Sequence, residues 1–346
     1  MKEHRNEPNF LSSAVPSELP LALQHPEVFG SKCDHVLLRE THLSYLFFTE
    51  REVFKLKKPV LKPFVDLSTA DARLFNARLE IALNRRLAQS VYYGLTKVTR
   101  NTEGHIILDG SGVVIDWLVH MRRLPHDRML DVLAKSDSVE TDDVDKLSSK
   151  LVTFYQLTRK STLAPEAHLE LLLRRLKIEH DLLLRTELDL PATLVESLIS
   201  ELENLLITDH RLFNARVCDA RIVDGHGDLR PEHICLTDDC PIFDCLEFSP
   251  DLRILDSADE LAYLTLELTY LGANEIGTAI RETYQAMSDD HIHPVVHSFY
   301  LSYRAMLRAR LCLWHLYDCP PMEQKKWRHK ALSYLTLASL ELGKSR

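Results

Sequence analysis

Short apolar runs alternate with polar breaks in the first third of the chain. Three of these runs are rich in Val, Leu, Phe and Tyr: HVLLRE (35–40), SYLFFT (44–49) and EVFKLKK (52–58). Runs of this composition predict the strands of an antiparallel meander. Between Ser68 and Ala88, apolar residues recur at helical spacing behind a Ser and a Thr that can cap a helix, so a helix is predicted there.

Strand signals return in VYYGLTKV, HIILDG and GVVIDWLVHMRRL and stop at Leu124. Beyond it, long Leu-rich segments such as EAHLELLLRRLKIEHDLLLR predict helices. One interruption, RIVDGHGDLRPEHICLTDDCPIFDCLEF, carries short β-like runs around a polar loop, and helices are expected to resume at Ile254. A strand-rich part followed by a helix-rich part predicts an α+β protein in two lobes.

The predicted boundaries follow this change of pattern. Residues 1–34 read as an N-terminal arm, 35–124 as a first lobe built on an antiparallel sheet, and 125–346 as a mainly helical second lobe. A chain of 346 residues exceeds the roughly 250–300 at which one hydrophobic core stops growing, which also favours two lobes.

Composition narrows the class of protein. The chain is 45% apolar and 27% charged, as in ordinary globular proteins, and it has no apolar run of membrane-spanning length. The net charge of -9 disfavours nucleic acid as a partner. The polar N-terminus holds no signal-peptide core, and the seven cysteines include no CxxC pair, so a cytoplasmic protein with reduced thiols is expected.

Glycine motifs for nucleotides are absent from the sequence. Only 10 glycines occur, and neither GxGxxG nor GxxxxGK[ST] is present. Dinucleotide-binding and Walker-type sites are therefore excluded.

The interruption between the helices concentrates the residues that could carry chemistry. Its polar loop is followed after a turn by two more carboxylates, and the set is His226, Asp228, Arg230, Glu232, His233, Asp244 and Glu247. Grouped carboxylates bind a hard cation, or orient a hydroxyl and accept its proton. A solvated turn is the alternative for any one of the aspartates.

The order of these residues resembles a known family. HGDLRPEH followed by IFDCLEF is similar to the catalytic loop and metal motif of the aminoglycoside phosphotransferase-like, protein-kinase-like superfamily. The spacing from Asp228 to His233 equals that of the HxDxxxxN loop, and Asp244 stands where a DFG-type motif has its metal-binding Asp. ETHLS, KLKKP and LNRRL resemble segments of a bacterial subgroup that has the HGDLRPEH loop.

The resemblance implies a bilobal kinase-like fold with a catalytic loop at 226–233 and a metal motif at 244–247. Asp228 would orient the acceptor hydroxyl or accept its proton, and Arg230 would stabilise charge on the transferring phosphoryl group. Asp244 would bind Mg²⁺. Glu247 would serve a second metal or hold the first through water, with a surface glutamate as the alternative.

His233 departs from the family, which usually has Asn at this position. Because Mg²⁺ prefers oxygen ligands, His233 either leaves the metal to Asp244 and Glu247, accepts Mn²⁺ instead, or marks the loss of phosphoryl transfer. Our hypothesis is retained activity with an altered metal preference. His226 is expected to support the loop backbone.

The family also places a phosphate-binding lysine on the third strand and its glutamate partner on the following helix. Lys55 and Lys57 lie on one face of the predicted strand, because strand side chains alternate. Lys55 is favoured, since Val53 would then line the adenine pocket, and Glu80 is its predicted partner. For Lys57 a solvated, basic sheet edge is the preferred interpretation.

The turn after the first strand normally covers the nucleotide phosphates, and here it reads ETHLS without glycine. The hydroxyl groups of Thr41 and Ser44, with nearby backbone N–H groups, could cradle phosphate oxygens. Ordinary turn formation explains Thr41 equally well.

Features further along the chain are open to two interpretations. Asp256, in preference to Asp259, is expected to stabilise the catalytic loop, with helix capping as the alternative for both. Arg304 and Arg308, with Tyr300 beside them, could form a substrate face, although a solvated surface is the usual outcome for such a pattern. Cys235, Cys240 and Cys245 with the loop histidines invite a zinc site, but their spacing favours small buried thiols.

The sequence thus predicts an ATP- and Mg²⁺- or Mn²⁺-dependent kinase for a hydroxyl group of a small molecule. The alternative is a pseudokinase that binds nucleotide or a protein partner without transfer. No membrane or nucleic-acid partner is predicted. The identity of the acceptor and the oligomeric state are not predicted.

Overall fold

The computed structural model describes residues 18–30, 33–62, 65–185 and 190–344. Two compact units are present, and each is built from two stretches of chain. The first unit comprises 1–128 with 235–250, and the second comprises 129–234 with 251–346. Part of the predicted arm at 1–34 lies outside the described residues. Its described part holds α1 (Leu19–Ala22) and a short 3₁₀ helix, η1 (Pro26–Phe29).

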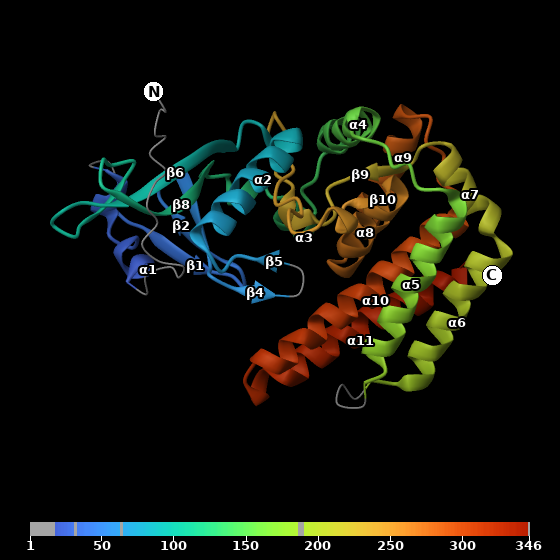
Figure 1. Ribbon diagram of the computed structural model, residues 1–346. Coiled ribbons are helices and arrows are strands. Elements are labelled where there is room, and N and C mark those ends of the chain that lie inside the picture. Colours follow the sequence, from blue (N-terminus) through green and yellow to red (C-terminus); the bar gives the residue numbers. More distant parts are fainter. Residues whose placement is uncertain (1–17, 31–32, 63–64, 186–189, 345–346) are drawn as a thin grey trace, which may run out of the picture. The chain divides into compact units, whose positions relative to one another are not determined.

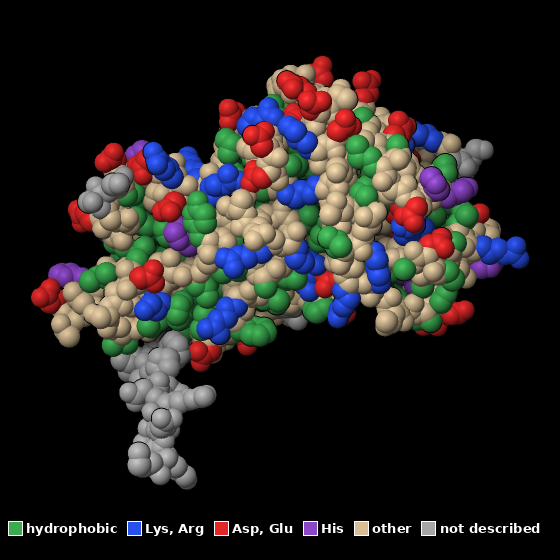
Figure 2. Space-filling model, turned by 90° about the horizontal axis from the view of Figure 1, so that it is seen from above, with side chains coloured by type: hydrophobic (Ala, Val, Ile, Leu, Met, Phe, Trp, Pro, Cys, Tyr) green, Lys and Arg blue, Asp and Glu red, His purple; other side chains and the backbone are tan. Residues whose placement is uncertain are grey.

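The surface of the described chain is of mixed character. No helix in these ranges combines the length and the apolar character needed to cross a membrane. On the face drawn in Figure 2, basic and acidic side chains are interspersed among polar and apolar ones.

A six-stranded antiparallel sheet with the order β1-β2-β3-β8-β6-β7 forms the first unit (Figure 1). Its strands are β1 (Leu37–Glu40), β2 (Ser44–Phe48), β3 (Glu52–Lys57), β6 (Tyr92–Arg100), β7 (Ile106–Leu108) and β8 (Val113–Arg122). A separate two-stranded ribbon pairs β4 (Leu61–Lys62) with β5 (Val65–Asp66). The predicted strands are confirmed. Because β3 lies between β2 and β8, it is an interior strand, and the predicted basic sheet edge at Lys57 is wrong.

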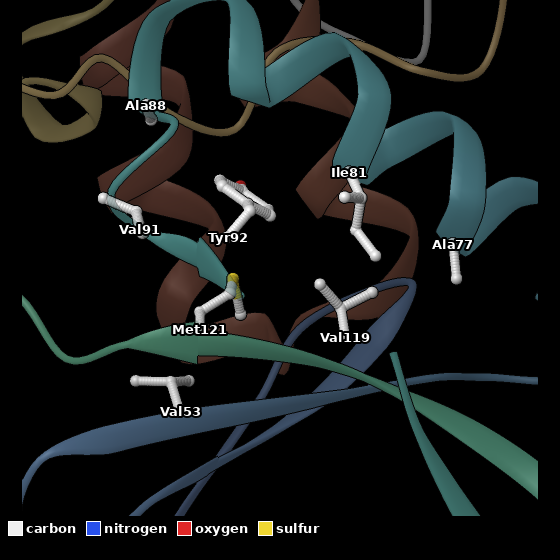
Figure 3. Packing of buried hydrophobic residues seen from close by; sticks show 8 residues of the cluster. All are labelled: Val53, Ala77, Ile81, Ala88, Val91, Tyr92, Val119 and Met121. Carbon is white, nitrogen blue, oxygen red and sulfur yellow. The ribbon is translucent and has the colours of Figure 1, made fainter. Parts of the chain in front are cut away.

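Strand β3 shows how alternation divides the sheet into two faces. Phe54 and Leu56 are buried in a cluster with Leu19 of α1 and with Leu23, which directly follows that helix. Val53, which alternates with them, belongs to a second cluster that also contains residues of the helix α2 (Ala70–Ala88). The apolar members of this second cluster are drawn in Figure 3: Val53, Ala77, Ile81, Ala88, Val91, Tyr92, Val119 and Met121.

Helix α2 begins where the sequence predicts. The Thr69 side chain caps it by accepting a hydrogen bond from the Ala72 backbone N–H at 3.1 Å. Its apolar residues face the sheet, which aligns the helix along β6 and β8. The predicted helix at 68–88 is confirmed within two residues of its start.

Residues 235–250 return from the second unit and pack with the first. The Cys245 backbone N–H donates to the Asn84 side chain at 2.9 Å, and the Ile242 N–H donates to the Leu87 carbonyl at 3.4 Å. The β-like runs HICL and PIFDC make isolated bridges here and no strand. The metal motif at 244–247, predicted as part of the helical lobe, falls within the sheet-bearing unit, where the Asn84 side chain of α2 is a partner of its backbone.

Helices dominate the second unit. They are α3 (Leu130–Lys135), α4 (Thr141–Leu157), α5 (Pro165–Leu183), α6 (Ala192–Thr208), α7 (His210–Cys218), α8 (Ser257–Tyr270), α9 (Asn274–Met287), α10 (Pro294–Asp318) and α11 (Pro321–Lys344). Strands β9 (Ile222–Asp224) and β10 (Ile254–Asp256) pair antiparallel. The helix expected from Ile254 thus starts at Ser257, because residues 254–256 pair with β9. The α+β fold class is confirmed.

Candidate functional site

In the first unit, Lys55 joins two carboxylates. Its Nζ lies 2.8 Å from Glu80 Oε1 on α2 and 3.2 Å from Asp244 Oδ1. Strand β3 and helix α2 are held together by the apolar cluster around Val53, so the ion pair spans two fixed elements. The predicted pairing of Lys55 with Glu80 is present, and Asp244 joins it from residues 235–250.

The backbone at Asp244 adopts a left-handed conformation, with φ at 62°. Asp tolerates this conformation better than most residues, and such geometry clusters at functional sites. The Asp244 N–H donates to the Tyr92 hydroxyl at 3.4 Å, and the carboxylate is 46% exposed. Asp244 therefore presents a partly hydrated hard oxygen ligand beside Lys55.

Lys57 is buried and has a structural position that the sequence interpretation missed. It is 3% exposed and joins Glu80 Oε2 to Glu247 Oε1, with the latter contact at 2.8 Å. Glu247 is 5% exposed, so the surface-glutamate interpretation is also wrong. The alternation of side chains along β3 indicates this position for Lys57, since it places Lys55 and Lys57 on the same face, where Glu80 lies.

The opposite charges of Lys55 and Lys57 and of their carboxylate partners offset the cost of burying these side chains. Burial lowers the pKa of Lys55, but Asp244 and Glu80 outweigh it and hold that pKa well above its usual value. Burial likewise raises the pKa of Glu80, and Lys55 with Lys57 brings it below its usual value. The pKa of Glu247 is raised, because burial exceeds the effect of Lys57.

In the second unit, Asp228 follows β9 on the predicted catalytic loop. Arg230 Nη2 lies 2.9 Å from Asp228 Oδ2, and Arg230 also pairs with Glu232. Burial raises the pKa of Asp228, yet Arg230, with His233 and His226, brings it down to about 2. Asp228 is therefore ionised throughout the physiological range, which suits the orientation of a hydroxyl better than early removal of its proton.

His233 uses both ring nitrogens within the loop. Its Nδ1 lies 2.9 Å from the Asp228 carbonyl oxygen, and its Nε2 lies 3.2 Å from Arg230 Nη2. A neutral imidazole donates through Nδ1 and accepts from Arg230 through Nε2 in this arrangement. His233 thus holds the loop, and no lone pair of its ring points to a metal.

Glu260 on α8 is the residue that organises the loop backbone. Its carboxylate accepts hydrogen bonds from the N–H groups of His226 and Gly227 and from the Tyr155 hydroxyl at 2.9 Å. Burial raises the pKa of Glu260, and these donors reduce that rise. The preference for Asp256 in this role was wrong, although Glu260 lies in the same sequence segment.

The other predicted residues of that segment have structural partners. Asp256 caps α8 through the Ala258 N–H and pairs with Arg216. Asp259 pairs with Arg304 at 2.6 Å.

The predicted substrate face on α10 is not a solvated surface. Arg304 is 7% exposed, and Arg308 pairs with Glu267 at 2.9 Å. The buried Tyr300 lies with its hydroxyl 3.2 Å from Asp256 Oδ2. These side chains tie α10 to α8 and the end of β10.

His226 has the backbone-supporting position that was expected. It is fully buried, and its Nδ1 accepts from the Asp228 N–H at 3.2 Å.

Thr41 closes the turn between β1 and β2. Its hydroxyl donates to the Ser44 carbonyl and accepts from the Ser44 N–H, both at 3.0 Å. Ser44 is 2% exposed. This geometry favours turn formation for Thr41, and phosphate binding by the turn stays a prediction. Val53 is 7% exposed in its cluster, and its contact with adenine likewise stays a prediction.

Asp244, Glu247 and His233 differ in how well they suit the metal chemistry that the kinase-like resemblance implies. Asp244 fits, because its carboxylate is partly exposed and of the type Mg²⁺ prefers. Glu247 is committed to Lys57, and the His233 ring is committed to the loop. Across the described ranges no group of three or more His, Cys, Asp or Glu side chains is arranged to hold a metal ion. Cys235, Cys240 and Cys245 are buried thiols.

Comparison with known sequences finds relatives but no matching family model. Uncharacterized proteins of Mycobacterium tuberculosis and Mycobacterium bovis are each 29% identical to this chain over 280 residues. The match covers 79% of this chain and 54% of each relative. The chain therefore spans about half the length of the curated relatives it matches.

Comparison with solved structures shows the fold. A choline/ethanolamine kinase family protein from Mesorhizobium loti matches with a TM-score of 0.55 and 12% identity, over 94% of each chain. A mutant aminoglycoside 2'-phosphotransferase in complex with GDP matches with a TM-score of 0.54 and 14% identity, over 93% of this chain and 96% of that one. A third match, at a TM-score of 0.53 and 10% identity, is an aminoglycoside phosphotransferase with AMP-PNP and hygromycin B, over 93% and 98% of the two chains.

These matches confirm that the chain has the protein-kinase-like fold found in small-molecule kinases. The bacterial subgroup to which the loop sequence points stays a prediction.

Proposed function

We propose that the chain is a phosphotransferase that moves the γ-phosphoryl group of ATP to a hydroxyl group of a small molecule. The observation that supports this most directly is the ion pair of Lys55 with Glu80, joined by Asp244, in a kinase-like fold. Kinases of this fold use such a lysine to bind nucleotide phosphates and such an aspartate to bind Mg²⁺. Mg²⁺, or Mn²⁺ in its place, would neutralise phosphate charge when bound.

The roles of this chain's own residues follow from their surroundings. Glu80 holds the Lys55 ammonium in place, and Asp244 supplies an oxygen ligand for the metal. The ionised Asp228 orients the acceptor hydroxyl and receives its proton as the bond from phosphorus to the ADP oxygen breaks. Arg230 stabilises charge on the phosphoryl oxygens.

A cytoplasmic small molecule is the acceptor that we propose. The net charge of -9 and the interspersed charges in Figure 2 support a partner other than nucleic acid.

A pseudokinase is the second candidate, because His233 stands at the position where the family has Asn. The ring is engaged with Asp228 and Arg230, so it offers no metal ligand in place of the Asn amide oxygen. Such a protein would bind nucleotide without transferring phosphate.

The test is transfer of label from γ-labelled ATP to small molecules of a cytoplasmic extract, with Mg²⁺ or Mn²⁺. We expect labelled products with wild type and none with Asp228→Ala. The matched control is Asp238→Ala, which removes an exposed carboxylate. Binding of ATP without any labelled product would contradict the transferase and support the pseudokinase. Labelled GTP is run in parallel to identify the nucleotide.

A further inference from the structure

A pocket of about 480 Å³ opens in the second unit where three helices meet. The last two turns of α9, the first turn of α10 and the end of α11 line it. Its charged and polar residues include Arg281, His297, Ser298, Glu341 and Lys344. None of them takes part in the phosphotransferase site.

His297 is the first sign of a missing partner. The side chain is 4% exposed, and its Nδ1 has no hydrogen-bond partner among the described residues. Burial, reinforced by Arg281, lowers the pKa of His297 to about 4, so the ring is neutral at physiological pH. Buried polar atoms are almost always hydrogen-bonded, so an orphaned imidazole nitrogen at a pocket points to a ligand.

Arg281 is the second sign. Its Nε is buried and has no hydrogen-bond partner in the described part of the chain. In contrast to Arg281, the neighbouring Glu341 has partners within the protein. It accepts hydrogen bonds from Ser298 at 2.8 Å and from Lys344 at 2.9 Å. The Glu341 charge is thereby matched within the protein, whereas the guanidinium of Arg281 keeps a donor for a ligand. Glu282 also lines the pocket and is exposed.

The start of α10 adds a favourable field for a negative group. This helix has 25 residues, and its positive dipole end lies at the pocket. The Val295 N–H is capped by the His293 ring, and the His297 N–H donates to the His293 carbonyl. The helix therefore contributes its dipole, and the hydrogen bonds to a ligand come from side chains.

We propose that this pocket binds a small metabolite through one phosphate or carboxylate group. The anionic group is held by Arg281 and His297, and the apolar part lies against Ile292, Pro294 and Val295. A volume of this size accommodates such a molecule. The site is separate from the phosphotransferase residues of the same unit. Ser298 precedes Arg308, whose charge acts on Arg230, by ten residues, or about 15 Å along α10.

The experiment measures binding of three probes by calorimetry: phenyl phosphate, phenylacetate and inorganic phosphate. We expect saturable binding of phenyl phosphate or phenylacetate, and the pair distinguishes a phosphate from a carboxylate ligand. Inorganic phosphate is expected to bind more weakly because it lacks the apolar part. Arg281→Gln should weaken binding about tenfold or more, as expected for loss of a hydrogen bond to a charged group.

Arg211→Gln is the matched control, because Arg211 is exposed on α7 and lies outside the pocket. It should bind the probe as wild type does. A second variant, His297→Gln, is used with its melting temperature measured alongside, since His297 is buried. Arg281 is only partly buried, so its variant tests the site even if the His297 variant does not fold.

Two results would overturn the proposal. One is the absence of saturable binding of any probe at millimolar concentration. The other is equal affinity in wild type and Arg281→Gln. Loss of binding in Lys55→Ala together with retention in Arg281→Gln would place the probe at the phosphotransferase site and would equally overturn it.

Discussion

The carboxylate of Glu260 accepts a hydrogen bond from the backbone N–H of Gly227. The neighbouring His226 N–H donates to the same carboxylate at 3.1 Å. Both amides are buried, and they directly precede Asp228 in the chain. A side chain on α8 thus fixes the main chain from which the proposed catalytic carboxylate projects.

Replacement of Glu260 by Gln should lower both stability and transfer. The amide keeps one acceptor oxygen, so at least one buried donor loses its partner, at a cost of about 1–3 kcal/mol. A displaced Asp228 should lower kcat by about a hundredfold. Urea unfolding and the γ-phosphate assay measure the two effects. Glu196→Gln, at an exposed position of α6, is the control and should leave both unchanged.

Gly225→Ala tests the same contact from the opposite side. A Cβ at residue 225 would lie 2.6 Å from Glu260 Oε2 and 2.9 Å from its Cδ. The carboxylate cannot move away without losing its donors, so we expect destabilisation of about 1–3 kcal/mol. Gly343→Ala on α11 is the control, because a Cβ there meets nothing within 4 Å. Equal melting temperatures for Gly225→Ala and wild type would show that the contact is less rigid than described.

A double-mutant cycle tests the buried pair of Lys57 and Glu247. Lys57→Met should cost about 3–5 kcal/mol, because it leaves Glu247 buried without its cation. Adding Glu247→Leu should recover much of that loss, since an apolar pair can replace a buried ion pair. Urea unfolding of the four proteins gives the coupling energy.

The same variants separate the roles of the two lysines. The Lys57→Met, Glu247→Leu protein should keep measurable transfer, whereas Lys55→Met should lose it. Loss of transfer in the folded double variant, with retention in Lys55→Met, would assign phosphate binding to Lys57.

His233→Ala tests whether the ring binds metal. Because both ring nitrogens are engaged within the loop, turnover with Mn²⁺ and with Mg²⁺ should fall in the same proportion. The free energy of unfolding should fall by about 1–3 kcal/mol as the Asp228 carbonyl and Arg230 lose their partner. A selective loss of the Mn²⁺-dependent rate would identify His233 as a ligand, as the hypothesis of an altered metal preference requires.

The low pKa of Asp228 predicts an acid-dependent loss of stability. The pKa of this carboxyl group is about 2 in the folded state and 3.8 in the unfolded chain. The ionised group therefore stabilises the fold above pH 3.8, and this contribution disappears as the pH falls toward 2. Its full size is at most about 2 kcal/mol. The stability difference between wild type and Asp228→Asn, measured by urea unfolding at decreasing pH, should shrink in that window. A difference independent of pH would contradict the assigned pKa.

Local patterns in the sequence were sufficient for most of the fold. Alternation and composition predicted the strands of the six-stranded sheet, and helical spacing with Thr69 as cap predicted α2. The start of α8 was misplaced because residues 254–256 are a strand only through pairing with β9, far away in sequence. Pairing of distant segments leaves no local pattern.

The part of the candidate site that depends on the spacing of residues in the sequence was predictable. Lys55 and Glu80 were paired from strand alternation and family order, and the structure brings them to 2.8 Å. Burial was not predictable in this way, so the sequence favours a solvated position for Lys57 and Arg304, and a surface position is its alternative for Glu247, although each is nearly inaccessible. The choice between Asp256 and Asp259 missed Glu260, because the position of α8 in space decides which carboxylate reaches the loop, and no local pattern in the sequence shows that position.

The return of residues 235–250 to the first unit constrains how the protein can be assembled. The sheet-bearing unit lacks Asp244 and the Glu247 counter-charge of Lys57 until residue 247 has been synthesised, whereas the last strand of its sheet ends at Arg122. A nascent chain that ends near residue 200 would therefore carry Lys57 with only half of its ion pairs. Neither unit is a contiguous gene segment, so recombination at one crossover cannot exchange a complete unit between relatives.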